Sequence, residues 1–198
     1  RWVTLAPDEP ASRLALSDAL THAAVVASNQ HDASGALAAS AESVRAARAL
    51  VDTSRTLLAL SKLSNALLTD SVVRRWQAPA DVTARTEVVA EAARVHEALL
   101  VLAPRNAPAL VGLLALHLEH ANFEALPRVL ELCNVDEFTA EGRDTWLFAM
   151  LALGRSKAVL EKRAWVDGAQ TFDTLLGFAL AAAEQGELET AARWARAA

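Results

Sequence analysis

Residues 172–198 read FDTLLGFALAAAEQGELETAARWARAA, and this stretch gives the clearest indication of the fold class. Its apolar residues recur at three- and four-residue steps on either side of a break, a spacing that places them on one face of an α-helix. The break is Gln185-Gly186, where glycine permits the tight reversal of the chain that a helical hairpin requires. The stretch therefore predicts two helices, 172–184 and 187–198, joined by a short turn.

Small and large residues follow one another through this hairpin in a fixed order: Leu175-x-x-Phe178-Ala179-x-x-Ala182-x-x-x-Gly186-x-Leu188-x-x-Ala191-x-x-Trp194-x-x-x-Ala198. The order resembles a nearly complete tetratricopeptide repeat (TPR), a helix–turn–helix unit of α-solenoid proteins. In such a unit, Ala179 and Ala191 let the paired helices cross closely, and large side chains fill the gaps between layers. The large residues here are Leu175, Phe178, Leu188 and Trp194.

Two further stretches resemble the segment that joins one such repeat to the next. Residues 102–110 read LAPRNAPAL, and Phe123 follows them at the expected distance. Leu114 and Leu126 stand where the family has small residues, so we expect looser or differently angled packing there. Residues 5–10, LAPDEP, repeat the linker pattern ahead of a helix that is too long for a standard repeat.

The helical period continues through the rest of the chain. Asp81 is a suitable N-cap for a helix that Pro104 ends, because its carboxylate can accept hydrogen bonds from the first turn. Gly154 suits a left-handed helix end, and residues 77–80, QAPA, are the clearest linker. The other expected helices are 10–28, 34–51, 53–68 with a continuation to Trp76, 110–118, 124–133, 144–153 and 156–163.

About ten helices in five antiparallel pairs follow, because short connections force neighbouring helices to pack antiparallel. Together with the resemblance, this predicts an all-α, right-handed, TPR-like α-solenoid. We expect residues 1–198 to form a single domain, irregular over 1–80 and more regular over 81–198. Both ends look cut within a repeat, so we expect a piece of a longer protein with further repeats or domains.

The composition favours helices and argues against several classes of function. Hydrophobic residues make up 53% of the 198 residues, much of it alanine, and tyrosine is absent, so a large β-sheet is not expected. A net charge of −5 without a basic stripe argues against a nucleic-acid partner. The uncharged runs fall short of the ~20 residues that cross a membrane. One cysteine excludes an internal disulfide, and the compartment stays open between cytoplasm and periplasm.

Candidate chemical sites are few. His117 and His120 lie three residues apart and could hold a metal with Glu124 or His96, but one groove histidine and one turn histidine explain them more simply. Cys133 has no surrounding nucleophile signature and fits as a small apolar residue. No glycine-rich phosphate loop and no strained serine turn occur in the sequence. We therefore expect no catalytic residue, no cofactor and no metal.

The five tryptophans are the largest side chains. Trp146 and Trp194 fall on helical core positions, whereas Trp76 and Trp165 lie near helix ends. Aromatic side chains at such ends, and Trp2 near the start, could anchor a partner. Filling the core or covering an end of the stack is the favoured interpretation.

The resemblance implies a protein-interaction scaffold or adaptor. In the family, stacked hairpins curve, and the first helix of each pair lines a concave groove for a peptide, a helix or a partner subunit. The surface expected here is apolar with acidic spots and lacks a Lys/Arg clamp for acidic peptide ends, so an apolar helix or a neighbouring subunit fits better. The groove-facing residues that the resemblance implies are Val111, Ala115, Leu118, Glu119, Asp173, Leu176, Leu180 and Glu184.

Two other functions stay open. The chain could be a sensor or regulatory segment of a larger bacterial signalling protein, since Ala-, Leu- and Arg-rich helical arrays flank ATPase and DNA-binding domains. It could also be an accessory domain of an enzyme or of a secretion machine. The flanking sequence would separate these alternatives from a scaffold.

Overall fold

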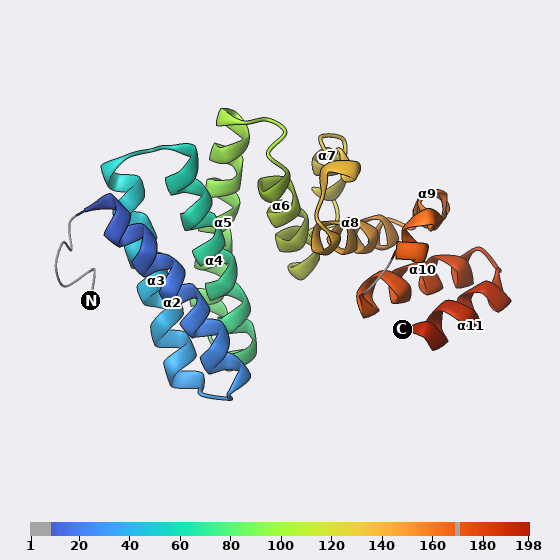
Figure 1. The fold of residues 1–198 in the computed structure, drawn as a ribbon, viewed down its shortest axis with the longest axis horizontal. Coiled ribbons are helices and arrows are strands. Elements are labelled where there is room, and N and C mark those ends of the chain that lie inside the picture. Colours follow the sequence, from blue (N-terminus) through green and yellow to red (C-terminus); the bar gives the residue numbers. More distant parts are fainter. Residues whose placement is uncertain (1–8, 169–170) are drawn as a thin grey trace. The chain divides into compact units, whose positions relative to one another are not determined.

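The computed structural model describes residues 9–168 and 171–198, and that part of the chain is helical (Figure 1). Helix accounts for 81% of the residues, and no strand occurs among the described ones. The described residues contain ten α-helices, which pack largely in chain order. The predictions of an all-α fold and of about ten helices are therefore confirmed for the described residues.

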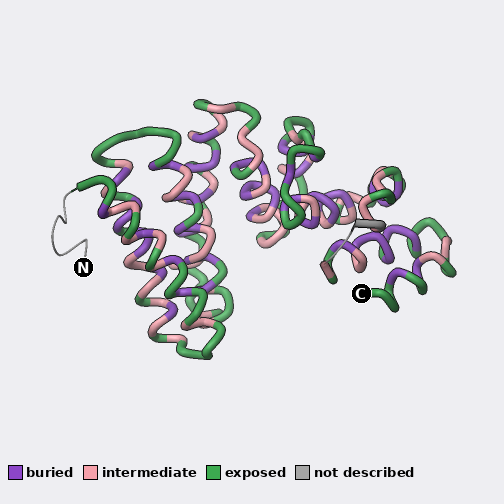
Figure 2. Tube along the Cα trace, viewed as in Figure 1, coloured by how far each residue is buried: buried purple, intermediate pink, exposed green. Residues whose placement is uncertain are grey.

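The chain divides into two compact units, residues 1–112 and 113–198. The division falls inside helix α6 (Ala107–Glu119), which corresponds to the helix expected at 110–118. In both units the buried residues are concentrated in the helices, while the connections are mostly exposed (Figure 2). The predicted single domain stays a prediction.

The first unit contains four long helices joined by short connections (Figure 1). Helix α2 packs against α3 and α4, and α4 packs against both α3 and α5. Their bounds agree with the expected helices to within two residues, except that α4 begins four residues later than expected. The four helices are α2 (Pro10–Asn29), α3 (Ala33–Thr53), α4 (Leu57–Gln77) and α5 (Val82–Leu102).

Polar side chains cap three of these helices. The Asp81 side chain accepts a hydrogen bond from the backbone N–H of Ala84, which confirms the predicted N-cap of α5. Thr56 caps α4 in the same way, through the amide of Ala59, and this explains why α4 begins after Thr56 rather than at residue 53. Asp32 caps α3.

Buried hydrogen bonds cross the first two helix interfaces of this unit. Between α2 and α3, the hydroxyls of Thr21 and Ser43 lie 2.7 Å apart. Between α3 and α4, the Ser40 hydroxyl donates to the Asp70 carboxylate at 2.5 Å, and Arg74 donates to the same carboxylate at 2.8 Å. Asp70 is only 2% exposed, so its charge is stabilised by these two donors rather than by water.

The α4–α5 interface contains a buried serine–histidine pair. The ring Nδ1 of His96 lies 2.6 Å from the Ala92 carbonyl oxygen, which can only accept, so Nδ1 carries the proton. Nε2 of the neutral ring therefore accepts from the Ser64 hydroxyl, 2.8 Å away. Burial of His96 lowers its pKa, which keeps the ring neutral.

The second unit consists of shorter elements. Its central helix is α10 (Phe172–Glu184), which packs against α8 (Ala140–Ala152), α9 (Ser156–Glu161) and α11 (Leu188–Ala197). The helix predicted at 124–133 is wrong in extent, because only α7 (Leu126–Leu130) forms. Pro127 has no amide to donate to the Phe123 carbonyl, so the turn before Leu126 does not continue as α-helix. After Leu130 the backbone changes to i→i−3 hydrogen bonds, from Leu132 to Val129 and from Cys133 to Leu130. Two short 3-10 segments complete the unit: η1 (Val135–Glu137) and η2 (Arg163–Gly168).

The hairpin formed by α10 and α11 agrees closely with the sequence expectation. The bounds of α10 are those predicted, and Gly186 turns the chain with φ of 79°. Phe178 and Trp194 are buried and meet edge to face with ring centroids 5.7 Å apart. Ala179 and Ala191 are buried, and the close helix crossing that the resemblance implies there stays a prediction. Gly154 also adopts the predicted left-handed conformation, with φ of 65°.

Leu188 departs from the predicted packing. It was expected to fill a gap between layers, but its side chain is 69% exposed. At 100° per residue, Leu188 lies about a quarter turn from the centre of the face that Ala191 and Trp194 share. The expectation that it packs in the core is therefore wrong.

Candidate partner-binding groove

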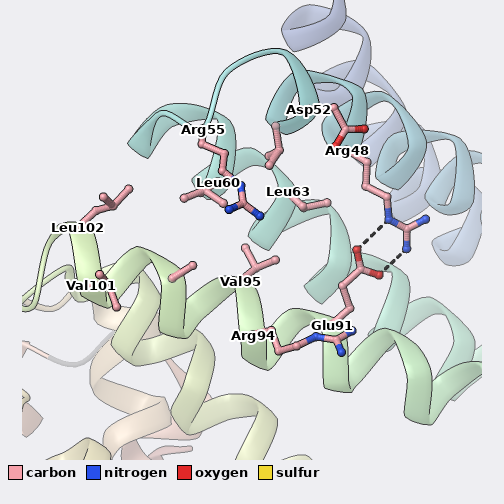
Figure 3. Close-up of a pocket in the computed structure, with 12 residues that line it drawn as sticks. Arg48, Asp52, Arg55, Leu60, Leu63, Glu91, Arg94, Val95, Val101 and Leu102 are labelled. Atoms are coloured by element: carbon pink, nitrogen blue, oxygen red, sulfur yellow. Dashed lines mark hydrogen bonds and ion pairs between the residues drawn. The ribbon is translucent and has the colours of Figure 1, made fainter.

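A groove opens in the first unit between the end of α3, the start of α4 and the second half of α5 (Figure 3). Its volume of about 620 Å³ lies within the range of typical ligand-binding pockets. The residues that line it are Arg48, Val51, Asp52, Arg55, Leu60, Leu63, Glu91, Arg94, Val95, Ala98, Val101 and Leu102.

The floor and one rim of the groove are apolar. Leu60, Leu63 and Val95 are buried beneath it. At the end of α5, Val101 is 82% exposed and Leu102 is 55% exposed. Apolar side chains are thus continuous from the core to the surface, and covering the exposed ones would remove them from water.

An ion pair crosses one end of the groove. Arg48 on α3 donates through Nε to Glu91 on α5 at 2.8 Å, and its Nη2 donates to the second oxygen of the same carboxylate (Figure 3). These hydrogen bonds raise the pKa of Arg48. The pair joins α3 to α5, which are not adjacent in sequence, and so helps to hold the two walls together.

Two further guanidinium groups at the groove have no hydrogen-bond partner among the described residues. Arg55 lies in the connection between α3 and α4, and Arg94 lies on α5, one turn beyond Glu91. Neither makes a hydrogen bond or an ion pair with any residue that the structure describes. In Figure 3 the Arg55 guanidinium points into the groove. The groove is lined by three arginines and two carboxylates, those of Asp52 and Glu91, so its net charge is +1.

The eight residues that the resemblance implied as groove-facing do not line this groove. Val111, Ala115, Leu118 and Glu119 lie on α6, where all four are half-buried. The other four lie on α10. Leu176 is half-buried there, whereas the exposed residues are Asp173, Leu180 and Glu184.

The α10 residues form a partly exposed row along the helix. Leu176, Leu180 and Glu184 are spaced by four, so they share one face. Leu180 is 45% exposed, and Glu184 accepts a hydrogen bond from the Ser156 hydroxyl. This face stays a prediction as a binding surface.

Two of the histidine and cysteine candidates, His96 and Cys133, have defined hydrogen-bond partners. No cluster of His, Cys, Asp and Glu suited to a metal occurs in residues 9–168 or 171–198. Both ring nitrogens of His96 are engaged, as described above, so it cannot join His117 and His120 as a ligand. Cys133 is half-buried and donates to the Val129 carbonyl at 3.3 Å. Burial raises the pKa of its thiol to about 11, so it is a poor nucleophile.

In the Ser64–His96 pair the serine hydroxyl donates to a histidine nitrogen, as a catalytic serine does to its general base. The sequence did not indicate this pair. His96 has no exposed surface and Ser64 is 8% exposed. A substrate cannot reach the serine oxygen in this packing, and the pair serves to join α4 to α5.

The tryptophans divide as their sequence positions suggested. Trp146 and Trp194 are each 8% exposed and belong to the core. Trp165 meets Trp146 edge to face at 5.7 Å, which attaches η2 to α8. Trp76, near the end of α4, is 68% exposed. Trp2 lies outside the described residues.

No family model matches the chain, and no curated protein is significantly similar to it. Among the described helices, none is both long and apolar enough to span a bilayer. The functional assignment therefore rests on the groove's own residues.

Proposed function

We propose that the chain is a protein-interaction module, a scaffold or adaptor, that binds an apolar helix of a partner protein in the groove between α3, α4 and α5. The exposure of Val101 and Leu102 beside a buried apolar floor is the observation that carries the proposal. Apolar side chains that continue from a core to an open groove typify surfaces that a partner covers.

The form of the partner follows from the all-helical surface. Residues 9–168 and 171–198 contain no strand, so they offer no sheet edge to which a partner could add a strand. Affinity must then come from side chains inserted into the groove. A helix supplies them on one face, at three- and four-residue spacings.

We further propose that the second unit is a right-handed, TPR-like stack, as the sequence pattern implies. The contacts of α10 with α8, α9 and α11 support this, because the first helix of a repeat packs against both the preceding pair and its own partner helix. The long helices of the first unit, 20 or 21 residues each, are a separate elaboration. In such a stack the α10 face with Leu176 and Leu180 would be a second surface for a partner.

Site-specific photo-crosslinking tests the proposed function. A benzoylphenylalanine at position 101 should form an adduct with a partner from the native cell extract, because this position lies on the groove rim. Position 82, occupied by Val82, is the matched control, since it is 57% exposed on the same helix and outside the groove.

The adduct from position 101 should disappear when Leu102→Asp places a charge on the rim. Equal adducts from positions 101 and 82, or an adduct that survives Leu102→Asp, would show that the groove is not the binding surface.

A further inference from the structure

We infer that the groove selects a partner helix that carries a carboxylate beside its apolar residues. The inference rests on the proposed function and specifies the chemistry of the same groove. It comes from the charges at the groove, whereas the proposed function comes from its apolar surface.

The charged groups of the groove are not equivalent. Arg48 and Glu91 satisfy each other through two hydrogen bonds. Arg55 and Arg94, and on the acidic side Asp52, make no hydrogen bond or ion pair with a described residue, so the unpaired groups are two cations and one anion. A guanidinium binds a carboxylate through two parallel N–H donors, so an acidic side chain of the partner matches these two groups better than any other side chain.

The α5 wall sets the spacing of the partner residues. Arg94, Val95, Ala98, Val101 and Leu102 lie on one face of α5, because their positions fall within about a third of a turn. Arg94 and Leu102 are eight residues apart, which is about 12 Å along the axis. A matching helix would carry an acidic residue at one end and apolar residues over the next two turns.

The groove also limits how acidic the partner can be. Asp52 and Glu91 leave only one positive charge in excess at the groove, and the chain as a whole carries a net charge of −5. A strongly acidic segment would be repelled by the chain, whereas a single carboxylate among apolar residues would not. A lysine in place of that carboxylate would add positive charge to a groove that already carries one in excess.

Fluorescence anisotropy with designed peptides tests the inference on the full chain. The probes are three fluorescein-labelled, end-blocked, Ala/Gln-based helical peptides with leucines on one face over two turns. They differ only at the position one turn before the first leucine, which is Glu, Gln or Lys.

We expect the Glu peptide to bind about five- to tenfold more tightly than the Gln peptide, since the ion pairs are only partly shielded from water. The Lys peptide should bind most weakly. In the double variant Arg55→Gln/Arg94→Gln, the Glu and Gln peptides should bind equally.

Arg128→Gln is the matched control, because Arg128 is exposed, lies in the second unit and is likewise without a described partner. It should keep the preference for Glu. All the substituted arginines are exposed, so far-UV circular dichroism should show folded variants.

The outcomes separate the two proposals. Equal binding of the Glu and Gln peptides to the unmodified chain would overturn the carboxylate inference and leave the apolar groove as a binding site. A preference that persists in the double variant, or the absence of binding by all three peptides, would also overturn it. The crosslinking from position 101 decides the proposed function independently.

Discussion

Replacing Gly112 with alanine should destabilise the first unit through a single contact. Gly112 lies on α6 against the fully buried His96, and an added Cβ would stand 2.1 Å from the ring Nε2. The ring cannot withdraw freely, because the Ser64 hydroxyl and the Ala92 carbonyl hold its two nitrogens at 2.8 and 2.6 Å. The methyl group must therefore displace the ring or move α6.

The expected change in the free energy of unfolding combines one stabilising and two destabilising contributions. Alanine in an open helix position stabilises by roughly 0.5–1 kcal/mol relative to glycine. Overpacking a core costs about 1–3 kcal/mol, and losing the Ser64–His96 hydrogen bond costs about 0.5–1.5 kcal/mol more. Gly112→Ala should therefore lower the free energy of unfolding of the first unit by about 2 kcal/mol.

A double-mutant cycle measures this contact directly. Hydrogen exchange of the α4 and α5 amides reports the first unit, in the unmodified chain, in Gly112→Ala, in His96→Ala and in the double variant. With the ring removed, Gly112→Ala should become stabilising by roughly 0.5–1 kcal/mol, because only the helix propensity remains. Stabilisation by Gly112→Ala in the presence of His96 would show that the ring does not obstruct a Cβ at position 112.

Three further predictions concern His96, Ala191 and Cys133. Because the pKa of His96 is lowered in the folded protein, the unfolded histidine protonates first as the pH falls through about 6.5. The free energy of unfolding should therefore be fully retained above that pH and decline below it by at most about 1.4 kcal/mol per pH unit. Urea titrations at pH 7.5 and 5.5 should show a smaller difference in this free energy for His96→Gln than for the unmodified chain. Ala191→Leu should reduce hydrogen-exchange protection over residues 172–198 by about 1–3 kcal/mol, whereas Ala197→Leu, at an exposed position, should not, and equal effects would show that the assigned helix register is wrong. Cys133, with a pKa of about 11, should be alkylated by iodoacetamide at pH 8 much more slowly in the native protein than in urea, and equal rates would contradict its burial.

The helices were predictable because their causes are local. The period of apolar residues, the N-cap Asp81 and the turn at Gly186 act over a few residues, so they can be read in one sequence. Both ends of α10 were placed correctly for this reason. The short extent of α7 shows the limit, because its apolar period indicated a longer helix, whereas Pro127 stands in its first turn and i→i−3 hydrogen bonds follow Leu130.

The groove and the buried polar contacts were not predictable in the same way. Serines such as Ser40 and Ser64 are compatible with a helix surface, and only tertiary packing shows that each meets a polar partner on the next helix. Arg55 and Arg94 are 39 positions apart, and nothing local indicates that they flank one cavity. Leu102 continued an apolar helical period, although it is exposed in the folded chain.

A methyl NMR titration with the Glu peptide tests whether the groove is the binding surface. Binding in the groove should change the chemical shifts of the Leu60, Leu63 and Val101 methyls and leave Leu176 and Leu180 on α10 unchanged. Shifts at Leu176 and Leu180 without changes in the groove would contradict it and would place binding on the face that the sequence resemblance implied.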